Sequence, residues 1–215
     1  MTVMGRILTT VFVVIVLAIG GGVYLSVRDK AGQPEGFQAG ELVREDSRRL
    51  NDVPGTDATF VEFLDFECEA CGAAFPYIEQ LRSQYGDRMN FVVRYFPIQS
   101  HFNSMRAARA VEAAAQQGKF EAMYKKMYET QTTWSEQQVP KDDVFRGFAT
   151  ELGLDMAAWD AAYADPATEE RIKRDVADGQ TLGVQGTPTL YLNGSEVKVN
   201  DFSQLSAEVE KALAN

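Results

Sequence analysis

The feature that most constrains this 215-residue chain is its cysteine content, because it has only two cysteines, Cys68 and Cys71, three positions apart. A mostly apolar, β-rich run at 59–65 precedes them, and a helical pattern follows and ends near 85–86. Side chains at i and i+3 on a first helical turn lie close enough for their sulfurs to form a disulfide. The sequence therefore predicts a strand, the cysteine pair and a helix in immediate succession.

This position predicts reactive rather than structural cysteines. The first residue of a helix lies among unpaired backbone N–H groups and at the positive end of the helix dipole, which both stabilise a thiolate. Because the thiolate attacks in disulfide exchange, we predict that Cys68 is the nucleophile and that Cys71 resolves the mixed disulfide.

Two other uses of the cysteines are weaker. A passive bridge between Cys68 and Cys71 would enclose only two residues and constrain the unfolded chain little. The two cysteines and His101, the single histidine, do not supply the four ligands of a structural zinc site. The sequence thus predicts a redox-active pair with no metal and no cofactor.

The order of the elements predicts an α/β fold. Strand, helix and strand across 59–95 form a βαβ unit, and helical patterns dominate an insertion at about 101–183. Asn193-Gly194 is a strong hairpin signal. Around it we predict a strand at 189–192, a second strand at 197–199 and a final helix at 201–213.

Residues 7–27 form an uncharged, mostly apolar run. As a helix this run would reach about 31 Å, close to the thickness of a bilayer's hydrocarbon core. We predict a transmembrane signal anchor here, with residues 1–6 in the cytoplasm and residues 28–55 as a tether that holds a short edge strand at 41–44. A signal peptide cleaved near 18–22 is the alternative, and the lack of an A-x-A site there favours the anchor.

The net charge of −10 belongs to residues 56–215, because residues 1–55 carry equal numbers of acidic and basic side chains. An acidic domain repels phosphate backbones, so we predict no nucleic-acid partner. The charges that flank residues 7–27 do not decide its orientation. We place the domain at 56–215 on the extracytoplasmic side of the cell membrane because disulfide chemistry operates there.

Two stretches resemble the DsbA-like thiol–disulfide oxidoreductases of the thioredoxin superfamily. Residues 61–72, VEFLDFECEACG, are similar to the active-site segment of that family, and residues 182–194, LGVQGTPTLYLNG, to its second signature. The similarity includes RYFP at 94–97 and spans roughly residues 41–215. It implies a thioredoxin fold with an inserted helical domain.

The resemblance also implies the roles of other site residues. The Thr187–Pro188 bond is expected to be cis and to face the cysteines, so Thr187 and Pro188 would line the substrate groove; an ordinary trans proline is the alternative. Glu62 occupies a position where the family often carries a buried acid, so we predict that it relays the proton of Cys71. The alternatives are a glutamate on an exposed strand face and Asp65 in the relay role.

The motif departs from the strongly oxidising members of the family. Glu69-Ala70 replaces their Pro-His, so no imidazolium lies between the cysteines. Glu67 and Glu69 add negative charge, which disfavours a thiolate on Cys68. We therefore predict a higher Cys68 pKa and a less oxidising couple than in those members.

Three other side chains stand out. His101 lies between a predicted strand and a predicted helix, where a surface or capping role is common. Trp134 and Trp159 fall inside the helical insertion and are predicted to be packing residues.

The sequence predicts an enzyme, a protein thiol–disulfide oxidoreductase that exchanges its disulfide with cysteine-containing exported proteins and is reset by a membrane redox partner. The family resemblance favours an oxidase, whereas the acidic motif favours a milder couple, so a reductase or isomerase of the same fold is an alternative. A non-catalytic tethered binding module is the third hypothesis, because a fold does not by itself imply a function.

Overall fold

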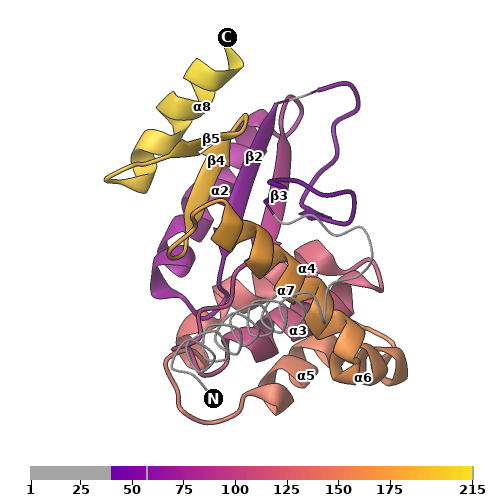
Figure 1. Cartoon of the computed structure of the whole chain (residues 1–215). Coiled ribbons are helices and arrows are strands. Elements are labelled where there is room, and N and C mark those ends of the chain that lie inside the picture. The colour runs from indigo at the N-terminus through magenta and orange to yellow at the C-terminus, as the bar shows by residue number, and fades with distance from the viewer. Residues whose placement is uncertain (1–39, 57, 215) are drawn as a thin grey trace, which may run out of the picture. The chain divides into compact units, whose positions relative to one another are not determined.

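The structure, a computed structural model, describes residues 40–56 and 58–214 (Figure 1). The predicted cytoplasmic segment at 1–6, the predicted anchor at 7–27 and the first part of the predicted tether lie outside these residues. Among the residues described, no helix has both the length and the apolar character needed to cross a bilayer.

A five-stranded sheet of order β1-β3-β2-β4-β5 forms the centre of the described domain (Figure 1). β2 and β3 are parallel, and the other neighbouring pairs are antiparallel. β2 is a central strand, buried along nearly its whole length, which explains its mostly apolar sequence. The strands are β1 (Arg48–Arg49), β2 (Thr59–Leu64), β3 (Asn90–Tyr95), β4 (Thr189–Leu192) and β5 (Ser195–Val197).

Helices connect the strands and form the insertion between β3 and β4, so the predicted α/β arrangement with a helical insertion is confirmed. In Figure 1, α3 to α6 lie beyond one end of the sheet and α7 runs from that group back to the sheet. The helical elements are α2 (Glu69–Tyr85), α3 (Ser104–Ala115), α4 (Phe120–Glu129), η1 (Gln131–Thr133), α5 (Asp142–Glu151), α6 (Met156–Ala164), α7 (Pro166–Thr181), η2 (Phe202–Gln204) and α8 (Leu205–Leu213).

The two faces of the sheet bury different hydrophobic clusters. Phe60 and Leu64 of β2 belong to the cluster that contains both cysteines, whereas Val61 and Phe63 belong to the cluster on the opposite face. Successive residues of a strand point to opposite faces. Glu62 therefore points to the same face as Phe60 and Leu64, which is the face of the cysteines.

α7 approaches the opposite face of the sheet through Gly179. A Cβ atom at this position would lie 2.8 Å from the ring of Phe96 and 3.0 Å from the ring of Phe63. These distances are too short for any side chain, so the glycine permits the close contact between helix and sheet.

Residues 40–50 belong to the domain and are not a tether. Arg94, fully buried on β3, donates to the carbonyl oxygen of Glu41 at 2.8 Å and to the carboxylate of Asp178 on α7. Asp178 also accepts hydrogen bonds from the Gly40 N–H at 2.8 Å and from Arg44 Nε at 2.6 Å. The predicted edge strand at 41–44 is therefore wrong: hydrogen bonds and an ion pair hold these residues. The strand at this edge of the sheet is β1, beside β3.

The hairpin near the C-terminus has a different register from the one predicted. Asn193 and Gly194 have φ values of 46° and 84°, as a two-residue hairpin turn requires. Leu192 then pairs directly with Ser195, so β5 covers Ser195–Val197 instead of 197–199. The predicted strand begins two residues too late because its apolar pattern starts only after the exposed residues of β5.

Trp134 and Trp159 are buried in the helical insertion. The Trp134 ring meets Phe145 edge-on with centroids 4.9 Å apart, and the Trp159 ring stacks on Tyr163 at 4.8 Å. The predicted packing role of both tryptophans is confirmed.

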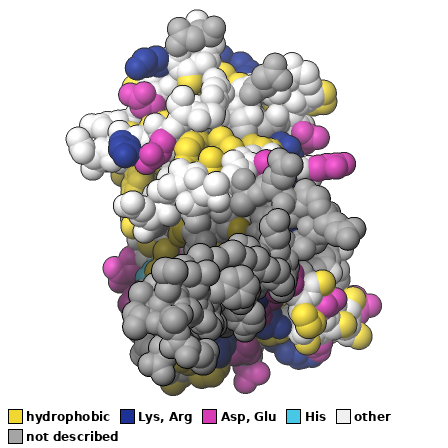
Figure 2. Space-filling view, viewed as in Figure 1, with side chains coloured by type: hydrophobic (Ala, Val, Ile, Leu, Met, Phe, Trp, Pro, Cys, Tyr) yellow, Lys and Arg dark blue, Asp and Glu magenta, His cyan; other side chains and the backbone are white. Residues whose placement is uncertain are grey.

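Charged side chains of both signs are interspersed on the face shown in Figure 2. On the described part of that face, Lys and Arg are scattered among Asp and Glu, and hydrophobic side chains gather over the sheet.

Candidate active site

The cysteine pair lies where β2 gives way to α2. Cys68 precedes the first residue of α2 and has an extended backbone conformation, and Cys71 lies in the first turn. The Cys68 Sγ atom is 3.3 Å from the carbonyl oxygen of Thr187. Both cysteines are free thiols, and 9% of Cys68 is exposed against 0% of Cys71. Of the two cysteines, only Cys68 therefore has surface open to solvent.

The two thiols differ in acidity. A hydrogen bond from Cys71 is the main reason why the Cys68 pKa is lowered to about 5; burial opposes this shift, and the Thr187 hydroxyl and the N–H groups of Ala70 and Cys71 add to it. Burial, and then the hydrogen bond to Cys68, raise the pKa of Cys71 well above its ordinary value. At neutral pH the pair is thus a thiolate beside a thiol.

The Cys68 pKa of about 5 lies above the value of ~3.5 found in DsbA, in the direction predicted for a motif without histidine. Glu67 and Glu69 are not among the main causes of the shift. Glu67 is buried, and its Oε2 atom accepts a hydrogen bond from the Asn103 N–H at 2.6 Å, while Glu69 is exposed. The expected effect of these two carboxylates on the acidity of Cys68 is therefore not among its leading causes.

Glu62 is buried in the middle of β2, with Val93 of β3 and Leu190 of β4 as its neighbours in register. Its Oε1 atom has no hydrogen-bond partner in the described part of the chain. Burial raises the pKa of Glu62 to about 8, and the charge of Cys68 adds to this shift. Glu62 in turn raises the pKa of Cys71. The predicted burial beneath the cysteines is confirmed, and the exposed-face alternative is wrong.

Asp65, the other acid considered for the relay, is also buried but is held by three partners. Its Oδ1 atom accepts from the Glu67 N–H at 2.8 Å, and its Oδ2 atom accepts from the Ile98 N–H at 2.9 Å and lies 2.6 Å from His101 Nδ1. Burial raises the pKa of Asp65 to about 6, although these hydrogen bonds lower it. Its carboxylate therefore holds the surrounding loops together.

The Thr187–Pro188 peptide bond is cis, as the resemblance implies. Both residues line a surface cavity of 420 Å³ that extends to Glu196 and Lys198 at β5. The Thr187 Oγ1 atom is buried and has no hydrogen-bond partner among the residues described. Its hydroxyl is near enough to Cys68 to help lower the pKa of that thiol. Thr187 thus lines this cavity together with Pro188 and also lies beside the Cys68 sulfur.

A family model described as "Thioredoxin" matches residues 54–211. The chain belongs to the thioredoxin family. A thioredoxin-like oxidoreductase from Silicibacter pomeroyi DSS-3 is 29% identical, with a TM-score of 0.67 over 80% of this chain and 95% of that one. The α-DsbA1 protein of Wolbachia pipientis shares the fold, with a TM-score of 0.66 at 17% identity over 80% and 94% of the two chains. This thioredoxin-family protein is a thiol–disulfide oxidoreductase.

A curated relative extends well beyond the matched region. The Na⁺/H⁺ antiporter NhaA 1 of Mycobacterium sp. (strain KMS) is 32% identical over 171 residues, which are 77% of this chain and 27% of the antiporter. The thioredoxin-family chain thus spans about a quarter of the length of the curated relatives it matches. Ion transport belongs to the whole antiporter and is not assigned to this chain.

Gln131, on η1 of the helical insertion, holds the active-site turn of this thioredoxin-family protein. Its Nε2 atom donates to the carbonyl oxygens of Phe66 and Cys68, both at 2.8 Å. Its Oε1 atom lies against Gly72, where a Cβ atom would be only 2.0 Å away. A glycine directly after the second cysteine is the one hint in the sequence, and no pattern links it to residue 131.

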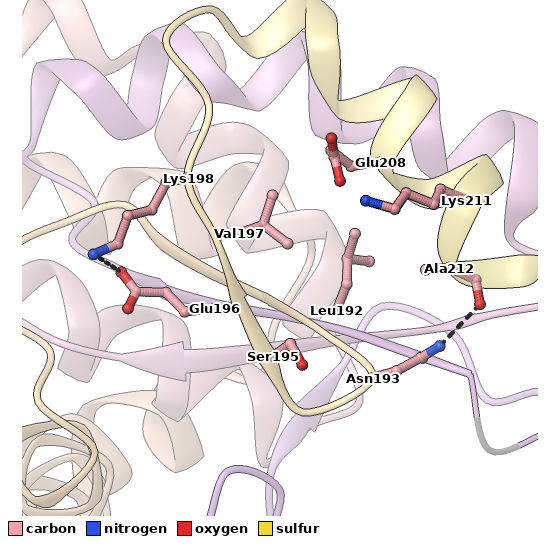
Figure 3. A pocket seen from close by; sticks show the side chains of 9 residues that line it. All are labelled: Leu192, Asn193, Ser195, Glu196, Val197, Lys198, Glu208, Lys211 and Ala212. Atoms are coloured by element: carbon pink, nitrogen blue, oxygen red, sulfur yellow. Dashed lines mark hydrogen bonds and ion pairs between the residues drawn. The ribbon is translucent and has the colours of Figure 1, made fainter. Parts of the chain in front are cut away.

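A second cavity, of 440 Å³, lies between the β4–β5 hairpin and α8 (Figure 3). Lys198 Nζ lies 3.5 Å from Glu196 there, and Asn193 Nδ2 donates to the Ala212 carbonyl at 3.2 Å. None of the predicted site residues lines this cavity. Within residues 40–56 and 58–214, no group of three or more His, Cys, Asp or Glu is placed to hold a metal ion.

Proposed function

We propose that this thioredoxin-family protein is a membrane-anchored oxidase that donates its Cys68–Cys71 disulfide to cysteines of exported proteins outside the cytoplasm. The observation that carries the proposal is the acidity of Cys68. Reduction leaves Cys68 as a stabilised thiolate with a pKa of about 5. Because stabilising the reduced form makes a disulfide a stronger oxidant, this environment favours the oxidase direction.

In the proposed reaction a substrate thiolate attacks Cys68 Sγ, and the Cys68–Cys71 bond breaks with its electron pair going to Cys71. The departing sulfur needs a proton at neutral pH because its pKa is raised. Glu62, with a pKa of about 8, still carries a proton at neutral pH and can supply it.

The second half of the reaction releases the product. A second substrate thiolate attacks the substrate sulfur of the mixed disulfide, and Cys68 leaves as its stable thiolate. The substrate gains a disulfide and gives up two electrons, and the protein is left with one thiolate and one thiol. A membrane redox partner would then reoxidise the pair.

Thr187 and Pro188 are proposed to bind the substrate backbone beside Cys68. The Thr187 carbonyl oxygen, which faces the Cys68 sulfur at 3.3 Å, is placed to accept an N–H from an extended chain. The adjoining cavity ends at Glu196 and Lys198, one acidic and one basic. An extended, cysteine-containing polypeptide fits this surface.

A reductase or isomerase is the second candidate, and the motif favours it. Glu69-Ala70 places no histidine between the cysteines, and a Cys68 pKa of about 5 stabilises the thiolate less than the value of ~3.5 in DsbA. In this case the membrane partner would keep the pair reduced.

The equilibrium potential of the pair against glutathione separates the two directions. An oxidase is expected between about −200 and −120 mV, and a value near −270 mV would favour a reductase. The Cys71→Ser variant serves as the matched control, because it can form only a mixed disulfide between Cys68 and glutathione and no internal disulfide.

Two labelling experiments test the remaining parts of the proposal. Rapid alkylation of one cysteine after mild reduction is expected, whereas a bridge that resists reduction would support a binding module. In intact cells that express Cys71→Ser, a membrane-impermeant maleimide should label Cys68. Labelling that requires lysis would contradict the extracytoplasmic location.

A further inference from the structure

His101 lies beside the active site although it belongs to the loop between β3 and α3. Its Nδ1 atom is 2.6 Å from Asp65 Oδ2, and 24% of its side chain is exposed against 0% for Asp65. The backbone N–H of His101 donates to the Ile98 carbonyl oxygen at 3.0 Å, and the backbone carbonyl oxygen of His101 accepts from the Ser104 hydroxyl at 3.0 Å. The imidazole is therefore held against a buried carboxylate and remains accessible to protons from solvent.

Asp65 connects His101 to the cysteine pair. The carbonyl oxygen of Asp65 accepts the Cys68 N–H at 3.2 Å, while its carboxylate binds His101 and the Glu67 N–H. Asp65 thus forms hydrogen bonds both to the turn that leads into α2 and to the imidazole of His101.

The charged groups with the largest effect on His101 are all anionic. Burial lowers the pKa of His101, but Asp65, Cys68 and Glu67 together raise it above its ordinary value. Asp65 follows β2, and Glu67 and Cys68 lie in the turn that leads into α2. Arg106 on α3 is directed elsewhere, because its guanidinium lies 4.9 Å from the Phe102 ring centroid and its Nε atom 3.2 Å from Asp142.

We propose that His101 is a redox-linked proton site, which binds a proton more tightly when Cys68 is a thiolate than when Cys68 is joined to Cys71. Reduction creates a negative charge on Cys68 where the disulfide carried none. By the reciprocity of linked equilibria, a protonated His101 then stabilises the reduced pair, so the disulfide becomes more oxidising as the pH falls. Protonated His101 would thus be a cation that lies outside the motif, whereas Glu69-Ala70 between the cysteines provides none.

Electrons and protons balance in this scheme. The substrate dithiol supplies two electrons, which break the disulfide and leave Cys68 as a thiolate and Cys71 as a thiol with one added proton. In the pH range between the midpoint of His101 in the oxidised form and its midpoint in the reduced form, His101 also takes up a fraction of a proton from solvent. The inference rests on disulfide exchange at the pair, which the proposed function also uses, but not on its direction.

The single histidine makes the test direct. The imidazole Cε1–H of His101 gives one NMR signal in the untagged full chain, which can be titrated in the oxidised and in the reduced form. We expect the midpoint to lie at least about 0.5 pH unit higher in the reduced form, because a nearby negative charge favours the imidazolium. Equal midpoints would overturn the proposal.

A thiol count on the same samples separates the two proposals. If no disulfide forms or breaks between Cys68 and Cys71, the proposed function fails. If the disulfide does form and break but the midpoint of His101 stays the same, only the present inference is contradicted. In the Cys68→Ser control, addition of reductant should leave the midpoint of His101 unchanged.

The His101→Gln variant gives a second measurement. Glutamine can still donate to Asp65 but does not titrate. The equilibrium constant for reduction of the disulfide by glutathione is measured for the wild type and for the variant. The ratio of the two constants should change about threefold between roughly pH 5 and pH 9. A constant ratio would refute the linkage, and a merely structural role of His101 would not produce the pH dependence.

Discussion

Glu62 lies on β2, and Asp65 lies one residue beyond the end of that strand. Both acids are buried, yet their hydrogen-bonding surroundings are opposite. Asp65 has three hydrogen-bonding partners, whereas Glu62 Oε1 has none in the described residues. Burial raises both pKa values, to about 6 for Asp65 and to about 8 for Glu62. The partners, and not burial, distinguish a group that holds the fold from one that can exchange protons near neutral pH.

The difference follows from position along the strand. Glu62 lies in the middle of β2, where the N–H and C=O groups of the neighbouring strands are already paired in the sheet. Asp65 follows the last residue of β2, where the loops offer N–H groups that need acceptors. A carboxylate at the end of the strand therefore finds donors, and one in the middle does not.

The largest expected effect is on stability. Asp65→Ala should lower the free energy of unfolding by about 3–5 kcal/mol, because the N–H groups of Glu67 and Ile98 and the imidazole of His101 lose their acceptor. Urea unfolding of the oxidised protein measures this, with Asp65→Asn, which keeps one acceptor oxygen, as the milder variant. A loss below about 1 kcal/mol would contradict the anchoring role of Asp65.

Glu62 should control how stability depends on pH. Its folded pKa of about 8 exceeds the unfolded value of ~4.3, so its contribution is fully present below the unfolded value and is lost as pH rises through the folded one. In the disulfide form, where neither cysteine titrates, the wild type should lose on the order of 3 kcal/mol between about pH 4 and pH 9.

The matched variant for this titration is Glu62→Gln. It should lose less stability than the wild type over the same pH range, because the amide has no proton to release. The same pH dependence in both proteins would show that Glu62 is not the buried neutral acid described above.

The comparison also predicts different kinetics. Glu62→Gln should slow the step in which Cys71 leaves or attacks by about 10²-fold at neutral pH, because the proton relay is lost. Asp65→Asn is the matched control and should change that step by less than about threefold. Acid quenching and mass spectrometry of the mixed disulfide measure the rate, and equal slowing by both variants would remove the distinction between the two acids.

The smallest effect concerns Cys68 itself. In the wild type its alkylation rate should rise with a midpoint near the pKa of about 5. Thr187→Val removes a hydroxyl that lowers this pKa, so the midpoint should move up by about 0.5–1 unit. An unchanged midpoint would mean that the Cys71 thiol and the N–H groups of α2 stabilise the thiolate without Thr187.

Patterns within short stretches were sufficient for much of the fold. The spacing of Cys68 and Cys71, the apolar β2 and the helical periodicities of the insertion are local features, because side-chain direction repeats every 2 residues in a strand and every 3.6 in a helix. The cis bond at Pro188 followed from the family resemblance and not from periodicity. Residues 40–50 could not be predicted in this way, because hydrogen bonds to Arg94 and Asp178 and the ion pair between Arg44 and Asp178 hold them.

The sequence by itself determined the position of the cysteine pair and the helix that presents it. Only the tertiary structure decided which acid is unpaired, that His101 binds Asp65 and that Gln131 holds the carbonyl oxygen of Cys68. The contacts made by His101 and Gln131 join residues 36 and 63 positions apart. No local period encodes such separations, since they depend on how the insertion packs against the end of the sheet.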